Sequence, residues 1–161
     1  MRGFELLQQV TLINPIFDFK YLKSIHYFLF QDIYSWAGKP RSFDMAKNGD
    51  VFTPAIDLPC YEDDVFQRAL AFSSSKIQTD KNSAAESLAR CLGMINTYHP
   101  FPEGNGRTQR IFISILAHQH HYEIDWKSAF PWEMVETFKA AHCSNYTPLI
   151  ELLQRLIIAK A

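Results

Sequence analysis

The 161-residue chain has few cysteines, and they do not suggest a disulfide framework. There are three, an odd number, and Cys60, Cys91 and Cys143 all lie in apolar or helical contexts. Small secreted domains that depend on disulfides usually carry more cysteines, in even numbers. We therefore expect all three to be small core residues in a protein of a reducing compartment.

The chain also lacks a strong net charge and a long apolar run. Its formal net charge of -1 gives no general attraction to nucleic acid or to an anionic membrane surface. No apolar stretch reaches the roughly 20 residues that a membrane-spanning helix needs, and the first residues do not have the pattern of a signal peptide. These absences predict a cytoplasmic protein that binds neither nucleic acid nor membrane. An effector delivered into the cytosol of another cell would have the same features.

Apolar residues, by contrast, are abundant. Hydrophobic residues make up 47% of the chain and aromatic residues 14%, with 13 phenylalanines. A chain of this length can bury a core as a single domain, and no repeat, low-complexity tract or internal linker divides it. We therefore expect one globular domain over residues 1–161.

Most of the sequence carries apolar residues at helical spacing. Residues typical of helix N-termini precede several of these segments, and Ser83 with Glu86 forms a capping box. The expected helices are a short one over Phe4, Leu7 and Val10 that ends by Asn14, and then segments from Asp18 to Trp36, Asp57 to Phe72, Ser83 to Tyr98, about Arg107 to Gln119, Ser128 or Pro131 through Phe138, and Thr147 to Ile157. Together they predict an all-α bundle with the segment that ends at Tyr98 at its centre.

Residues 41–53 have a different pattern. Two short segments flank Lys47-Asn48-Gly49, and an Asn-Gly pair is the strongest short hairpin signal because type I′ turns need positive φ at both central residues. A lone hairpin is only marginally stable in water. We therefore expect one small β-hairpin that rests on the helical body or on a ligand.

The most informative stretch runs from His99 to Arg110, with the sequence H-P-F-P-E-G-N-G-R-T-Q-R. Its two prolines end the preceding helix near Tyr98, whereas Gly104 and Gly106 permit positive φ and the close approach of a ligand to the backbone. The helical pattern then resumes. The loop therefore ends at the N-terminus of a helix, where unbonded N–H groups and the positive end of the dipole favour an anion.

The polar side chains of this stretch suit a polyphosphate and a proton transfer. Arg107 and Arg110 are expected on one face of the first helical turn, where two guanidiniums would hold phosphates. Glu103 is a hard oxygen ligand suited to a Mg²⁺ ion shared with those phosphates. His99 is the one side chain here that can take a proton near neutral pH, and Phe101 is expected to be a buried anchor of the loop.

The stretch fills every specified position of the signature of the Fic domain family, H-x-F-x-[DE]-G-N-G-R-x-x-R, which it closely resembles. The segment from His26 through Trp36 to Arg41, with the hairpin that ends in Phe52, also resembles the family's lead-in to its β-hairpin flap. The resemblance extends from about residue 25 to 117. It implies a Fic-like helical bundle with one small flap at about residues 41–53.

The resemblance implies a protein adenylyltransferase, which transfers AMP from ATP to a Ser, Thr or Tyr hydroxyl of a target protein and releases pyrophosphate. His99 would be the general base and Glu103 the Mg²⁺ ligand. Carried over by position, the nucleotide-binding residues would be Gly104, Asn105 at the α-phosphate, Gly106, Arg107 at the β-phosphate and Arg110 at the γ-phosphate.

The resemblance also gives the hairpin a function. In Fic proteins the flap lies over the motif and holds the target segment in extended form. Lys47, Asn48, Gly49 and Phe52 would then dock the target. Without the resemblance, a hairpin here would be interpreted as structural.

Two other functions stay open. Some relatives transfer a phosphate, a uridylyl or a phosphocholine group, and some of these depart from the signature at its second glycine or in the surrounding loop. Gly104 and Gly106 are both intact here, which favours AMP. A non-catalytic domain that only binds a nucleotide or a partner is the other possibility. The presence of both His99 and Glu103 argues against it.

Many Fic proteins carry, or receive from a partner, an inhibitory helix marked [ST]-x-x-x-E-[GN], whose Glu pairs with the second motif arginine. The nearest segment here runs from Thr147 to Glu151, but Leu152 follows where Gly or Asn is expected. We therefore expect no inhibitory partner for Arg110 within the chain. A small antitoxin-like inhibitor in trans is favoured over an effector that acts without restraint.

Overall fold

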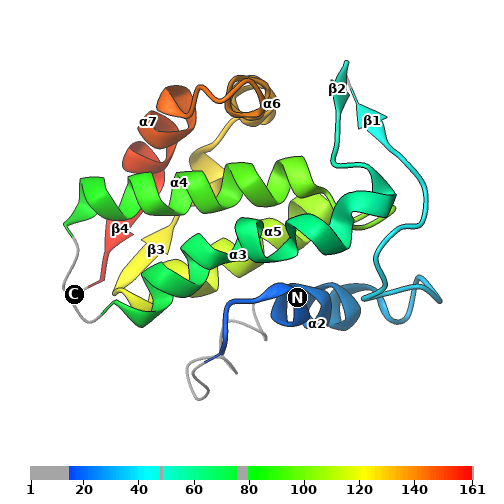
Figure 1. Ribbon diagram of the computed structural model, residues 1–161. Coiled ribbons are helices and arrows are strands. Elements are labelled where there is room, and N and C mark those ends of the chain that lie inside the picture. The colour runs from blue at the N-terminus through cyan, green and yellow to red at the C-terminus, as the bar shows by residue number, and fades with distance from the viewer. Residues whose placement is uncertain (1–14, 48, 76–79, 161) are drawn as a thin grey trace.

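The computed structural model describes residues 15–47, 49–75 and 80–160. Its elements are α2 (Phe19–Phe30), β1 (Ala46–Lys47), β2 (Asp50–Val51), η1 (Ala55–Asp57), α3 (Leu58–Ser74), α4 (Lys81–Tyr98), α5 (Asn105–Gln119), β3 (Tyr122–Ile124), η2 (Trp126–Ser128), α6 (Pro131–His142), α7 (Thr147–Leu156) and β4 (Ile157–Ala159). The predicted all-α bundle with a small hairpin is confirmed (Figure 1). The helix expected over Phe4–Val10 lies outside the described residues.

Helix α4 is the centre of the bundle, as predicted. It contacts α3, α5, α6 and α7, and Figure 1 shows it between α6 and α7 on one side and α3 and α5 on the other. Its buried residues include Ala84, Ala85, Leu88 and Ala89, small and large apolar side chains that allow close packing on several sides. The helix that carries His99 at its end is therefore held from several directions.

The C-terminal end of α4 is fixed by aromatic packing. Tyr98 is buried and its hydroxyl donates to the carbonyl of Leu58, 2.9 Å away, at the start of α3. Its ring meets Phe66 of α3 edge to face, and Phe66 meets Phe112 of α5 in the same way. Rings in this geometry attract each other beyond their buried area. The loop between α4 and α5 thus begins from a rigid position.

The predicted C-terminal end of α2 is wrong. Helix α2 begins after Asp18, whose carboxylate accepts from the Tyr21 N–H, as expected, but it ends at Phe30 and not at Trp36. Beyond Phe30 the chain forms successive turns, and the Tyr34 and Trp36 rings stack on each other at 4.3 Å. The aromatic residues that extended the apolar pattern therefore pack within these turns.

Helix α4 begins at Lys81, two residues before the predicted capping residue Ser83. Asp80 is the N-cap instead: its Oδ1 accepts from the N–H groups of Asn82 and Ser83. The Ser83 hydroxyl donates to Asp80 Oδ2 and so supports this cap. A carboxylate is at least as good an N-cap as a serine hydroxyl, and here it captures the first N–H groups.

A second pair of short strands was not predicted. β3 and β4 are antiparallel, with Glu123 opposite Ile158 and Ile124 opposite Ile157, so the end of the chain returns to the segment after α5. Three-residue strands are too short to show an alternating pattern. Ile157 and Ile158 also continue the apolar spacing of α7, which explains why the helix was expected to include Ile157.

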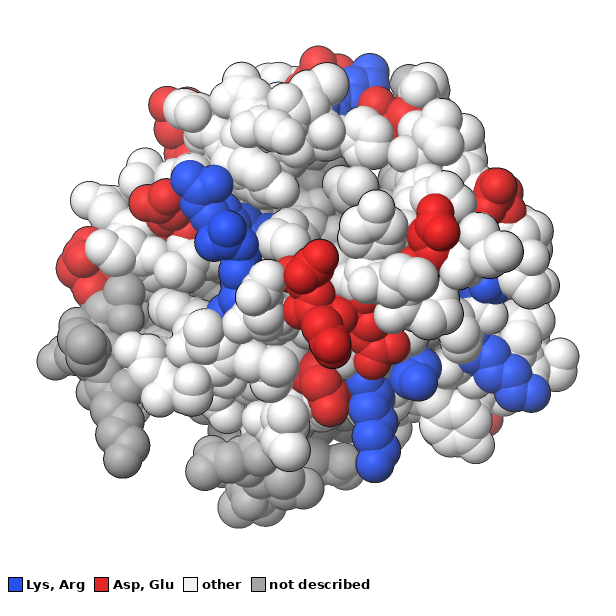
Figure 2. All heavy atoms as spheres, viewed as in Figure 1, with Lys and Arg blue, Asp and Glu red and all other residues white. Residues whose placement is uncertain are grey.

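The surface carries both signs of charge. Figure 2 shows acidic side chains gathered near the middle of one face, with lysine and arginine on either side of them. Cys91 is buried as predicted, but Cys60 and Cys143 are exposed, so the expectation that all three belong to the core is wrong. None of the helices in the described part of the chain is long and apolar enough to span a membrane.

Candidate functional site

The loop between α4 and α5 is built around a buried phenylalanine, as predicted. Phe101 is fully buried. The Asn105 side chain binds its backbone in both directions, accepting from Phe101 N at 2.9 Å and donating to Phe101 O at 2.6 Å. Asn105, expected at the α-phosphate, thus uses its side chain to shape the loop.

Gly104 precedes α5 in a conformation that only glycine adopts easily. Its φ is +83°, and a Cβ placed there would lie 2.5 Å from Cε2 of Phe30. Its carbonyl accepts from both the N–H and the hydroxyl of Thr108. The glycine therefore lets the loop pass close to α2 before α5 begins.

His26 supports the same loop from α2. It is fully buried and its ring stacks on Phe101 at 3.9 Å. Nδ1 accepts from the N–H of Gly38, so Nε2 carries the proton and donates to the carbonyl of Glu103 at 3.0 Å. Burial is the main cause that lowers the pKa of His26 and keeps it neutral. The only sign of this function in the sequence is a histidine within an apolar helical stripe.

His99 is the C-cap of α4, with φ of +45°. Its Nδ1 lies 3.2 Å from the carbonyl of Asn96, which can only accept, so Nδ1 carries the proton and Nε2 keeps a lone pair. The ring stacks on Phe52 at 3.7 Å. Burial, together with the charges of Arg41 and Lys47, lowers the pKa of His99 to about 4. The imidazole is therefore neutral at pH 7 and able to accept a proton.

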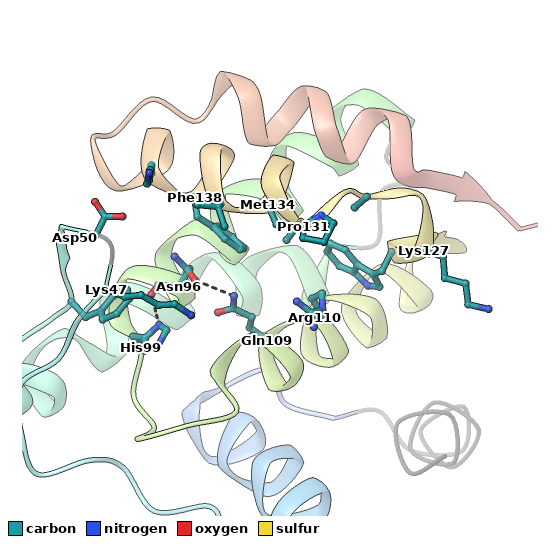
Figure 3. A pocket seen from close by; sticks show the side chains of 16 residues that line it. Lys47, Asp50, Asn96, His99, Gln109, Arg110, Lys127, Pro131, Met134 and Phe138 are labelled. Atoms are coloured by element: carbon teal, nitrogen blue, oxygen red, sulfur yellow. Dashed lines mark hydrogen bonds between the residues drawn. The ribbon is translucent and has the colours of Figure 1, made fainter.

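A cavity of about 620 Å³ opens beside this histidine (Figure 3). Arg110 and Gln109 of α5 line its floor with Asn96 of α4, and the Gln109 amide donates to Asn96 Oδ1 at 3.1 Å. Helix α6 and the segment before it form an apolar wall, consisting of Trp126, Ala129, Pro131, Met134, Val135 and Phe138. Nothing in the sequence beyond helical spacing pointed to this wall.

The charged groups of the cavity are mostly cationic. Lys47, Lys127, Lys139 and Arg110 line it, against one carboxylate, Asp50. A cavity that is cationic at one part and apolar at another suits an anion attached to an apolar or aromatic group.

The two motif arginines are placed differently. Arg110 is partly buried beside Gly106, where a Cβ would lie 3.6 Å from its Nη1. Burial and, next, the charge of Arg107 lower its pKa. Arg107 is exposed, and its guanidinium lies over the Phe30 ring, 4.5 Å from the centroid. The two arginines were predicted to share one face of the helix, but Arg110 lines the cavity and Arg107 does not.

Glu103 is exposed beside the start of α5, and its Oε1 accepts from the N–H of Gly104 at 3.0 Å. Among the described residues no group of three His, Cys, Asp or Glu side chains could hold a metal by itself. A single carboxylate near a phosphate site is nevertheless what Mg²⁺ commonly uses, because it takes its other ligands from phosphate oxygens and water. The residues present therefore fit a Mg²⁺ ion that arrives with a nucleotide.

The predicted hairpin is present and rests on the helical body. Lys47 pairs with Asp50 across a two-residue turn, in which Gly49 has φ of +88°; Asn48 lies outside the described residues. Phe52 is 6% exposed because its ring covers His99. The residue expected to contact a target thus faces the histidine, whereas Val51 before it is 64% exposed.

Comparison with known proteins gives a consistent result. The Fic/DOC family model matches residues 16–117. Protein adenylyltransferase VbhT of Bartonella schoenbuchensis is 35% identical over 155 residues, which is 96% of this chain and 32% of that protein. Probable protein adenylyltransferase y4lH of Sinorhizobium fredii is 30% identical over 158 residues, 96% of this chain and 80% of that protein.

A similar fold occurs in a solved structure. The ADP-bound N-terminal Fic domain of a VirB-translocated Bep effector protein from Bartonella quintana superposes with a TM-score of 0.84 at 24% identity, covering 99% of this chain and 82% of that one. The chain thus spans about a third of the length of VbhT but most of the length of an isolated Fic domain. With the family model matching well over half of its residues, the chain belongs to the Fic/DOC family.

Proposed function

We propose that this domain is a protein adenylyltransferase, which transfers AMP from ATP to a hydroxyl side chain of a target protein and releases pyrophosphate. One observation carries the proposal. A histidine with an unprotonated Nε2, His99, lines the same cationic cavity as Arg110 and Gly106 at the N-terminus of a helix. The names of the relatives VbhT and y4lH support the same activity.

In this reaction His99 Nε2 takes the proton from the target hydroxyl as its oxygen attacks the α-phosphorus. The bond from the α-phosphorus to the bridging oxygen then breaks, and pyrophosphate leaves with the electron pair. Because burial keeps the pKa of His99 low, the base is already unprotonated near pH 7. The Nδ1–H bond to Asn96 fixes the ring so that Nε2 is the basic atom.

The phosphates are held mainly by the start of α5. Its first N–H groups have no intrahelical acceptors and lie at the positive end of the helix dipole. Arg110 adds a partly buried guanidinium beside Gly106, and Arg107 is near enough to act on its pKa. Lys47, Lys127 and Lys139 supply further positive charge, and the apolar wall of α6 would receive the base.

Glu103 would hold Mg²⁺ together with the phosphates. The ion would neutralise phosphate charge in the transition state, where positioning and charge stabilisation dominate phosphoryl chemistry. Glu103 is suited to this because the Gly104 N–H orients its carboxylate and its side chain remains exposed.

The hairpin would hold the target segment beside His99. Strand β2, whose Val51 is exposed, can add main-chain hydrogen bonds to an extended peptide, and Lys47, Asn48 and Gly49 would dock the target. Phe52 would act through the histidine ring on which it stacks.

In the cytosol, a separate antitoxin-like protein would inhibit the enzyme. Arg110 forms no ion pair with any residue that the structure describes. Glu151, the nearest match to an inhibitory glutamate, lines a different groove between α6 and α7 with Trp132 and Arg155. Glu151→Gly should therefore leave the rate of target labelling unchanged, and a rise in that rate would indicate an internal inhibitor.

The proposal is tested by incubating the protein with cell lysate and ATP labelled at the α or the γ phosphate. Label that enters protein only from the α position indicates AMP transfer, and His99→Ala should remove it while leaving the fold intact. Loss of a general base typically costs about 100- to 10,000-fold in rate. Label only from the γ position would indicate phosphorylation. The absence of both would leave a binding function or transfer of another group, and the proposal would be wrong.

A further inference from the structure

Arg41 is a buried arginine whose hydrogen bonds all go to backbone carbonyls. It is 4% exposed. Its Nε donates to the carbonyl of His99 at 2.8 Å, Nη1 to that of Phe43 at 2.8 Å, and Nη2 to those of Thr53 and, at 3.4 Å, Tyr98. Its own N–H donates to Pro100 O at 2.8 Å. A buried guanidinium is costly unless its donors are satisfied, so this set of bonds is specific.

These contacts belong to a larger cap on the C-terminus of α4. A helix leaves its last carbonyls without intrahelical donors. Here the N–H and hydroxyl of Thr53 both donate to Thr97 O, and Arg41 supplies the donors for Tyr98, His99 and Pro100. Arg41 precedes the hairpin and Thr53 follows it. Both ends of the hairpin therefore cap the helix that carries His99.

The same contacts join the two ends of the hairpin to each other. Arg41 Nη2 donates to the carbonyl of Thr53, and Nη1 binds Phe43 on the incoming side. Phe52, the residue before Thr53, stacks on the His99 ring. Hydrogen bonds from Arg41 to backbone carbonyls and the contact between the Phe52 and His99 rings thus hold the hairpin and the histidine in one arrangement.

We propose that Arg41 is a positioning residue that holds His99 and both ends of the hairpin as one unit, so that a target docked on the hairpin presents its hydroxyl to Nε2. This inference rests on the proposed adenylyl transfer. Arg41 does not line the cavity, and each of its guanidinium nitrogens already donates to a backbone carbonyl, so we do not expect it to bind a phosphate. Its loss should therefore affect the reacting geometry rather than nucleotide binding. A misplacement of about 1 Å can cost on the order of 100-fold in rate.

Lysine cannot replace this arginine. A guanidinium is a planar fork of donors, whereas an ammonium is a compact charge at one point. Lysine would keep the positive charge near His99 but could not span the carbonyls of Phe43, Thr53 and His99 together. Arg41→Lys and Arg41→Met therefore separate the geometric effect from the effect of charge.

The test measures ATP binding with Mg²⁺, and the turnover of α-label onto target protein at saturating ATP, in Arg41→Lys, Arg41→Met and a control. Arg90→Met serves as the control because Arg90 forms an exposed surface pair with Glu86. We expect both Arg41 variants to bind ATP within about twofold of the wild type and to lose about 100-fold in turnover. The control should be unchanged in both.

The pH dependence of turnover is a second measurement, and it would not change if Arg41 only stabilised the fold. The charged groups that act on His99 are Arg41 and Lys47, which lower its pKa, and Glu103, which raises it. In Arg41→Met the acid limb of turnover should move to higher pH, because one cation is lost. In Arg41→Lys the limb should stay in place while the rate falls.

The outcomes separate this inference from the proposed function. If the wild type transfers no α-label, the proposed function fails. If the wild type is active and Arg41→Lys retains its turnover, Arg41 does not position the histidine. The same conclusion follows if ATP binding and turnover of the Arg41 variants fall equally, in proportion to the fraction of unfolded protein. Should Arg41→Met fail to fold, Thr53→Val decides together with Arg41→Lys. Thr53→Val removes only the hydrogen bond from the Thr53 hydroxyl to Thr97 O, so its turnover should fall less than that of Arg41→Lys, with ATP binding retained.

Discussion

Replacing Gly104 by alanine should destabilise the protein for two separable reasons. The first is its backbone: at φ of +83° an L-residue costs about 1–2 kcal/mol. The second is steric, because the new Cβ would lie 2.5 Å from Cε2 and 2.7 Å from Cζ of Phe30, a buried ring on α2. Forcing a buried ring aside typically costs about 1–3 kcal/mol. We therefore expect a total loss of about 2–5 kcal/mol in the free energy of unfolding.

Gly49 provides a matched control. It also has positive φ, at +88°, but no heavy atom lies within 4 Å of the position its Cβ would take. Gly49→Ala should thus show the backbone cost alone, and the gain from a less flexible unfolded chain is the same in both variants. Urea denaturation at constant m-value measures the two free energies. On a Phe30→Leu background, Gly104→Ala should cost less than in the wild type. Equal costs for Gly104→Ala and Gly49→Ala would refute the contact with Phe30.

Three further predictions concern activity. Glu103→Gln should lower transfer in a way that excess Mg²⁺ partly restores, with the Mg²⁺ requirement raised about tenfold or more; an unchanged Mg²⁺ titration would rule out a metal-binding function. Phe52→Leu should reduce target modification about tenfold or more while ATP affinity stays within about twofold, because the ring orients His99 rather than the nucleotide; equal losses in both would indicate partial unfolding. The pH profile of kcat/KM should show no loss from His99 between pH 8 and 6, since its pKa is lowered from 6.5 to about 4. The base is then unprotonated above about pH 5, so an acid limb with its midpoint near 6.5 would contradict the burial of the ring.

The sequence predicted the helices and the loop of the site because both depend on local signals. The prolines and glycines between His99 and Arg110 determine where α4 ends and α5 begins, and Phe101 is the buried anchor that its position suggested. The hairpin followed from one Asn-Gly pair. Such signals act over a few residues and can be interpreted without tertiary structure.

The features that the sequence did not reveal depend on contacts between distant segments. Arg41 and His99 are 58 positions apart, and His26 and Glu103 are 77 apart. The apolar wall of the cavity consists of residues of α6 and of the segment before it, and in the sequence the α6 residues look like any core-facing stripe. Asn105 fits the signature, but only the structure places its side chain on the Phe101 backbone.

The most direct test of the central claim is the stoichiometry of the reaction. With purified target protein and ATP, one pyrophosphate should be released for each AMP that becomes bound to protein, and neither should form with His99→Ala. A modified target accompanied by ADP instead of pyrophosphate would mean that the γ-phosphate is transferred. In that case this site would not be an adenylyltransferase.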